Sequence, residues 1–194
     1  MIARRPLLTL FLGFLLIGVA VYYWTSIKQN TSVDIAGYAV GAMQGFQKSP
    51  NRESAPDLPF KNASGESLTL RDYEGQVLLV NFWATWCAPC VYELPALDRL
   101  QAALGGEEFR VLAISLDLKG QEVAGPYLEK LSIDRLQPLT DPTNVLARSV
   151  GAIGLPTTIL YDRNSREIGR LSGPAEWDEE EALALLQQAI KQTR

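Results

Sequence analysis

The stretch from Val80 to Leu97, VNFWATWCAPCVYELPAL, contains both cysteines of the chain and is the strongest indication of its fold. It overlaps the apolar run Val77 to Phe82, VLLVNF, which is typical of a β-strand buried on both faces. Cys87 and Cys90 follow this run, and an amphipathic helix is expected from Val91 to Leu104. A CxxC pair between a buried strand and the start of a helix is a specific sign of a redox-active pair.

The position of the two cysteines predicts a different role for each. Free backbone N–H groups and the positive end of the helix dipole favour an anion at a helix N-terminus, so we expect the Cys87 pKa to lie below the ordinary value of about 8.5. Cys87 is the predicted nucleophile, and Cys90, one turn later, the resolving thiol. Two alternatives are a structural disulfide, which adds little stability across so short a loop, and half of a zinc site. No cofactor is expected, because the dithiol is itself the redox couple.

Outside this stretch, short apolar runs alternate with longer amphipathic segments, which is the pattern of an α/β domain. Further strands are predicted at Phe109–Leu116, Thr157–Tyr161 and Glu167–Leu171. Further helices are predicted at Gln121–Leu131, at Pro142–Val150 and after Asp178, which with Glu181 would form a capping box. Residues 163–165 are expected to form the turn between the last two strands.

The N-terminal part of the chain predicts a membrane anchor. Residues 6–27 carry no charged side chain and, as a helix, are long enough to cross a hydrocarbon layer of about 30 Å. Arg4 and Arg5 predict a cytoplasmic N-terminus, and the aromatic residues 22–24 suit the far membrane interface.

These features divide the chain into a transmembrane signal anchor at residues 1–27, a linker at 28–55 and an α/β domain at 56–194. The anchor would hold the protein at the inner membrane as a single-pass protein, with its domain in the periplasm or an equivalent extracytoplasmic space. A cleaved signal peptide is the alternative, since residues 18–20, Gly-Val-Ala, resemble a cleavage site. Both alternatives predict an exported domain.

The composition excludes several classes of function. A net charge of −4 and a pI near 5.0 provide no basic surface for nucleic acid, which is not expected as a partner. The chain has no histidine, and this removes histidine general bases, Cys-His nucleophilic pairs and histidine-containing zinc sites. No metal site is therefore predicted.

Three segments carry a family resemblance: Val80 to Leu97, the APDL of residues 55–58 and the GLPTT of residues 154–158. With them the sequence resembles the membrane-anchored TlpA/ResA branch of thioredoxin-like proteins, and GPAEW at residues 173–177 is closer to TlpA. The resemblance implies a thioredoxin fold, in which helices flank a central mixed β-sheet. It also implies reduction of disulfides in exported proteins, such as apocytochrome c or copper-site proteins, with electrons from an upstream membrane thiol reductant.

The resemblance also assigns residues to the site. Pro156 matches the cis-proline that faces the cysteines in this superfamily, and a cis bond would leave the Leu155 backbone free to pair with an extended substrate. An ordinary trans proline is the alternative. Trp83 and Trp86 match an aromatic pair around the motif, where either substrate contact or core packing is expected, and Trp86 is assigned to substrate binding.

Asn81 stands where thioredoxins carry a buried aspartate, and an asparagine cannot accept a proton from a thiol. Glu93, three residues after Cys90, matches an acidic position of the TlpA/ResA branch and is expected to take over proton transfer at Cys90. A solvated helix glutamate is the alternative.

The predicted activity is thiol:disulfide oxidoreduction, working as a protein-disulfide reductase. The residues Ala88-Pro89 separate the cysteines, without the histidine of strongly oxidising relatives, and this favours reduction. A copper metallochaperone using the two sulfurs is a rival from another class, although it would lack a third ligand. A peroxidase is a rival among enzymes, since peroxiredoxins share the general fold.

Overall fold

The computed structural model describes residues 17–19, 22 and 33–193. The predicted anchor at 6–27 and the first residues of the predicted linker lie mostly outside these ranges. Among the residues described, no helix is long and apolar enough to cross a membrane. The chain divides into two units, Met1–Val33 and Asp34–Arg194, and the second unit contains the fold described below.

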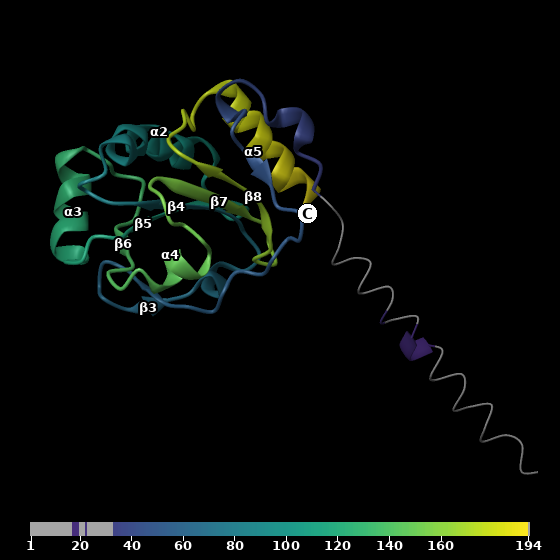
Figure 1. Ribbon diagram of the computed structural model, residues 1–194, viewed down its shortest axis with the longest axis horizontal. Coiled ribbons are helices and arrows are strands. Elements are labelled where there is room, and N and C mark those ends of the chain that lie inside the picture. Colours follow the sequence, from purple (N-terminus) through teal and green to yellow (C-terminus); the bar gives the residue numbers. More distant parts are fainter. Residues whose placement is uncertain (1–16, 20–21, 23–32, 194) are drawn as a thin grey trace, which may run out of the picture. The chain divides into compact units, whose positions relative to one another are not determined.

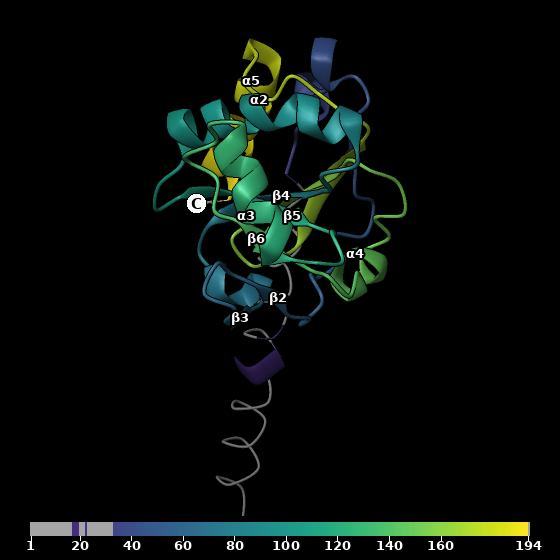
Figure 2. The same ribbon diagram turned by 90° about the vertical axis from the view of Figure 1, so that its left-hand side faces the viewer.

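Within the described residues of the second unit, the fold consists of eight strands and four α-helices (Figures 1 and 2). The strands are β1 (Gln47–Lys48), β2 (Phe60–Lys61), β3 (Ser67–Leu68), β4 (Val77–Trp83), β5 (Phe109–Ser115), β6 (Leu139–Thr140), β7 (Thr157–Tyr161) and β8 (Glu167–Ser172). The helices are α2 (Ala88–Leu104), α3 (Gln121–Lys130), α4 (Val145–Ser149) and α5 (Glu180–Gln192). Three 3-10 helices precede β4 in the sequence: η1 (Ala36–Tyr38), η2 (Gly41–Met43) and η3 (Leu70–Tyr73).

All eight strands join one mixed sheet in the order β1-β8-β7-β4-β5-β6-β2-β3. Strand β4 lies at its centre, parallel to β5 and antiparallel to β7. In both views α2 and α5 cover one face of the sheet, while α4 lies on the other. The predicted mixed sheet with flanking helices is confirmed.

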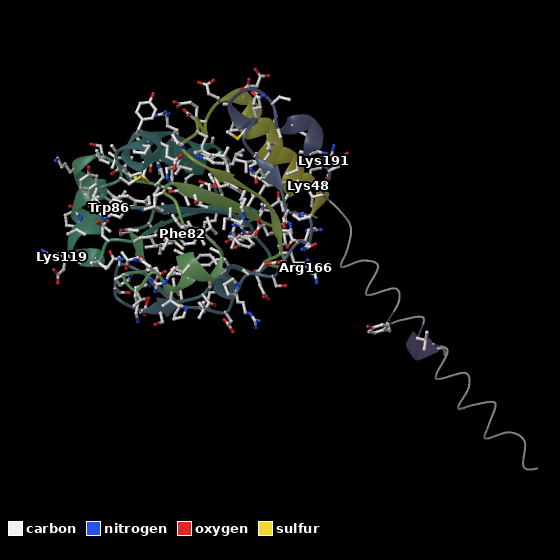
Figure 3. The ribbon with its side chains drawn as sticks, viewed as in Figure 1. Lys48, Phe82, Trp86, Lys119, Arg166 and Lys191 are labelled. Atoms are coloured by element: carbon white, nitrogen blue, oxygen red, sulfur yellow. A yellow bond between two sulfur atoms is a disulfide. The ribbon has the colours of Figure 1, made fainter. Side chains whose placement is uncertain are left out.

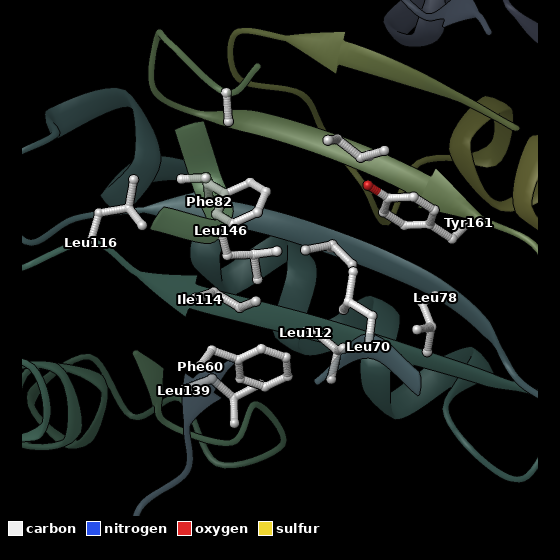
Figure 4. Packing of buried hydrophobic residues seen from close by; sticks show 14 residues of the cluster. Phe60, Leu70, Leu78, Phe82, Leu112, Ile114, Leu116, Leu139, Leu146 and Tyr161 are labelled. Carbon is white, nitrogen blue, oxygen red and sulfur yellow. The ribbon is translucent and has the colours of Figure 1, made fainter. Parts of the chain in front are cut away.

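The apolar run that predicted the central strand is buried along its whole length, because helices or loops cover both faces of β4. Its alternate residues Leu78, Val80 and Phe82 pack into a cluster with β5 side chains and with Leu146 of α4 (Figure 4). Because side chains alternate along a strand, Asn81 points to the opposite face, towards α2. The polar residue thus lies under the helix that carries the cysteines.

Residues 34–55, most of the predicted linker, pack onto the domain. Ile35, Met43 and Phe46 are buried, η1 and η2 contact α5, and β1 pairs with β8. Gly169 of β8 permits this approach, because a Cβ there would lie 2.5 Å from a Phe46 ring carbon and from the Gln47 carbonyl oxygen. The segment has no regular hydrophobic period because its buried apolar residues lie in short 3-10 helices and loops, not on one face of a long helix or strand.

Three helix starts differ from the prediction. Helix α4 begins at Val145, not Pro142. Helix α2 begins at Ala88, not Val91, because Cys87 is its N-cap and the Cys87 sulfur accepts a hydrogen bond from the Cys90 N–H at 3.3 Å. The capping box predicted for Asp178 is wrong. Helix α5 begins at Glu180 without a side-chain cap, and Asp178 instead accepts from Arg99 Nε at 2.6 Å.

Candidate active site

The two cysteines form a disulfide at the N-terminus of α2. Their sulfur atoms are 2.03 Å apart and their Cα atoms 5.3 Å apart. Cys87 is 6% exposed and Cys90 is fully buried, so Cys87 carries the more accessible sulfur. Within residues 17–19, 22 and 33–193, no group of three His, Cys, Asp or Glu side chains is placed to hold a metal ion.

A buried carboxylate holds the loop that leads into the cysteines. Asp117, just after β5, accepts hydrogen bonds from the Thr85 backbone N–H at 2.9 Å and from the Thr85 hydroxyl at 2.7 Å. The Ser115 hydroxyl donates to the same carboxylate at 2.8 Å. Hydrogen bonds to a charged acceptor are stronger than neutral ones, so this contact fixes the turn between β4 and α2.

The peptide bond between Leu155 and Pro156 is cis, as the resemblance implies. This loop leads into β7, and Thr157 is the first residue of that strand. Thr157 pairs with Phe82, which lies at the C-terminal end of β4, just before the cysteine motif. The Thr157 hydroxyl donates to the Gly154 carbonyl at 2.6 Å, and the Pro156 carbonyl accepts from the Gly173 N–H at 2.9 Å. The loop is therefore held at the end of the sheet from which the CxxC motif starts.

The two tryptophans of the motif lie in different surroundings. Trp83 is fully buried and its ring lies 6.3 Å from that of Tyr127, whereas Trp86 is 71% exposed at the surface (Figure 3). Trp86 borders a hollow of about 420 Å³ whose lining includes Leu155, Ile153 and α4 residues. Of the aromatic pair, Trp86 alone is available to a substrate.

Glu93 is a buried carboxylate on α2, with 1% of its surface exposed. Its Oε1 accepts from Asn81 Nδ2 at 2.7 Å, and its Oε2 accepts from the Ala175 N–H at 3.0 Å and from Trp177 Nε1 at 3.1 Å. Burial raises the pKa of Glu93 from 4.5 to about 7, although these three hydrogen bonds oppose the rise. The charge of Glu176 is a smaller cause of the same rise. The alternative of a solvated glutamate is thereby excluded.

Three partners of this site were not predicted from the sequence. Thr158 of β7 accepts from Asn81 Nδ2 at 2.9 Å, and Ala175 and Trp177 reach Glu93 from the loop before α5. Both segments belong to motifs that carry the family resemblance, GLPTT and GPAEW, and those motifs were the available signal. Nothing in the local sequence says that the two segments converge on one carboxylate.

Comparisons with known proteins identify the family of the chain. Residues 52–167 match the sequence model of the AhpC/TSA family. The thioredoxin-like protein YneN of Bacillus subtilis is 40% identical over 152 residues, which are 77% of this chain and 81% of YneN. The thiol-disulfide oxidoreductase ResA of Bacillus thuringiensis is 28% identical over 121 residues, 62% of this chain and 69% of ResA.

Solved structures give the same answer for the fold. A crystal structure described as a putative thiol:disulfide interchange protein DsbE from Chlorobium tepidum superposes with a TM-score of 0.63 at 28% identity, covering 74% of this chain and 97% of that one. The Cys87–Cys90 disulfide at the start of α2 and these relatives together make the protein a thiol-disulfide oxidoreductase. The chain belongs to the AhpC/TSA family of thioredoxin-like proteins and is similar to the thiol-disulfide oxidoreductase ResA.

Proposed function

We propose that this oxidoreductase works as a reductant of disulfides in exported proteins, held at the outer face of the inner membrane by residues 6–27. The observation that carries the proposal is the CxxC pair at the N-terminus of α2, with Cys87 the more accessible sulfur and Trp86 and Leu155 beside an open hollow. An extended polypeptide would pair with the Leu155 backbone and place its disulfide against Cys87.

The proposed cycle conserves electrons and sulfur bonds. The Cys87 thiolate attacks one sulfur of the substrate disulfide, forms a mixed disulfide and releases the other substrate sulfur as a thiol. The Cys90 thiolate then attacks the Cys87 sulfur, which releases the second substrate thiol and closes the Cys87–Cys90 disulfide. A membrane dithiol donor supplies two electrons and two protons to restore the reduced pair.

Glu93 is the proposed proton acceptor for the buried Cys90 thiol. It lies one helical turn after Cys90 on α2, and its pKa of about 7 suits proton exchange near neutral pH. In the reduced protein its negative charge would raise the Cys90 pKa and leave attack by Cys87 largely unchanged. The family resemblance of the sequence implies substrates in cytochrome c assembly or in assembly of oxidase copper sites, and we propose these as the source of the substrates.

The redox potential tests the direction of the reaction. With Ala88-Pro89 between the cysteines, we expect a value nearer to that of thioredoxin, about −270 mV, than to that of DsbA, about −120 mV. Equilibration of the chain with glutathione buffers measures it. A value above about −180 mV would identify an oxidant or isomerase and contradict the proposal.

The anchor is tested by fractionation of cells that make the full chain. We expect the protein in the membrane fraction, resistant to extraction by high salt or by carbonate, with its C-terminus open to protease from outside the cytoplasm. We expect this because residues 6–27 are uncharged and long enough to span the membrane, and because Arg4 and Arg5 favour a cytoplasmic N-terminus. A mature N-terminus at Val21 would instead identify a cleaved signal peptide.

A further inference from the structure

Three buried polar side chains meet between the sheet and α2. Asn81 of β4 and Thr158 of β7 are paired residues of neighbouring antiparallel strands, and Glu93 reaches them from α2. Asn81 donates both of its amide hydrogens, to Glu93 Oε1 at 2.7 Å and to Thr158 Oγ1 at 2.9 Å. Its Oδ1 is buried and has no hydrogen-bond partner among the described residues. A buried amide oxygen without a partner is costly, so this arrangement needs an explanation.

The two oxygens of Glu93 are not equivalent as proton sites. Oε2 accepts from the backbone N–H of Ala175 and the indole N–H of Trp177, and neither group can act as an acceptor. A proton on Oε2 would face two donors. When Glu93 is neutral, its proton must therefore lie on Oε1, the oxygen that faces Asn81.

A proton on Oε1 conflicts with the observed orientation of Asn81, because Nδ2 also presents hydrogen. A half-turn of the amide group exchanges the places of its nitrogen and oxygen. Oδ1 then accepts from the Glu93 hydroxyl, and the Thr158 hydroxyl, which can act as donor or acceptor, turns to donate to it. In the observed orientation Oδ1 is the amide atom without a partner, and the proton on Glu93 selects between the two orientations.

We propose that Asn81 is a two-position amide switch that follows the proton on Glu93, with the Thr158 hydroxyl as its reversible partner. Asn81 and Thr158 are then positioning residues for the proton acceptor. The observed orientation, with Nδ2 towards Glu93, is the one for the ionised carboxylate. The amide switch itself does not involve a thiol. Its effect on the reaction rests on the proposed function, in which Glu93 accepts the proton of Cys90.

The charges around Glu93 place its titration in an accessible range of pH. Burial, with a smaller contribution from the charge of Glu176 in the loop before α5, raises its pKa to about 7. Glu176 also interacts with Arg99 of α2, which pairs with Asp178. Strands β4 and β7 contribute no charged side chain, and η2, the sequence GAM, has none. The disulfide sulfurs do not titrate, so the oxidised protein isolates the titration of Glu93.

The experiment is an NMR titration of the oxidised full-length chain in detergent micelles, with ¹⁵N in asparagine side chains and ¹³C in glutamate carboxyl groups. The Asn81 signal is identified by its absence in Asn81→Leu. We expect the Asn81 amide signals to move between two limiting positions from pH 5 to pH 9, with the midpoint of the Glu93 carboxyl near pH 7. The nuclear Overhauser contact between the Asn81 amide protons and the Thr158 methyl group should be strong at high pH and weak at low pH.

Glu93→Gln is the matched control. A glutamine must present its oxygen to the Ala175 and Trp177 donors and its NH₂ to Asn81, so it imitates the neutral acid and should hold the amide in its low-pH position at every pH. If Glu93 titrates while the contact from Asn81 to Thr158 stays constant, the switch is wrong and the proposed function stands. If the Glu93 carboxyl does not titrate between pH 5 and pH 9, the switch is also wrong. Reduction assays on the same samples test the proposed function separately.

Discussion

Cys87→Ser is expected to lower reduction of a protein disulfide to the uncatalysed rate, whereas Cys90→Ser should still attack and then stop as a stable mixed disulfide. Cys87 is the more accessible sulfur, at the N-terminus of α2, where the helix dipole favours its thiolate. Cys90 is fully buried, and we expect it to react with the Cys87 sulfur alone. Turnover with an insulin-type substrate, followed by non-reducing gels and mass spectrometry, measures both outcomes.

The Cys90→Ser variant also serves to identify natural substrates. In cells, Cys90→Ser should accumulate disulfide-linked complexes with exported proteins, and the double variant Cys87→Ser/Cys90→Ser should form none, which makes it the matched control. Apocytochrome c or copper-site proteins among the trapped partners would agree with the proposed substrates. Mixed disulfides that form equally well with Cys87→Ser would assign attack to Cys90 and contradict the roles given to the two sulfurs.

The oxidised protein is expected to lose about 3 kcal/mol of unfolding free energy between pH 4.5 and pH 8 through Glu93 alone. In the folded chain the pKa of this carboxyl is raised from 4.5 to about 7, so between these values the folded state binds a proton that the unfolded state has released. The stabilisation is complete below pH 4.5 and disappears as the pH rises through about 7. Denaturant unfolding of the oxidised chain, followed by tryptophan fluorescence at several pH values, measures the loss.

Glu93→Gln removes the titrating group while keeping its size, and it should remove most of this pH dependence. Glu176→Gln is the control, because Glu176 is a neighbouring, partly exposed carboxylate and its replacement should leave the dependence largely in place. Equal slopes of unfolding free energy against pH in the native chain and in Glu93→Gln would show that Glu93 has no raised pKa. The kinetic role proposed for it would then lose its basis.

The sequence alone was sufficient where a feature depends on contiguous residues. The run Val77 to Phe82 predicted the buried central strand, and the position of Cys87 and Cys90 after it predicted a redox pair at a helix start. Both follow from local backbone geometry, because a strand and the helix N-terminus next to it are formed by neighbouring residues. The family resemblance added the cis bond before Pro156, which is present.

Only the tertiary structure decided the surroundings of Glu93 and the place of residues 34–55. The donors Ala175 and Trp177 are 82 and 84 residues away in sequence, and packing alone brings them to the carboxylate. Residues 34–55 dock through isolated apolar side chains and through the pairing of β1 with β8, neither of which leaves a period in the sequence. Burial and hydrogen bonding set a pKa through the three-dimensional neighbours of a group, so the pKa of Glu93 depends on contacts that no local pattern encodes.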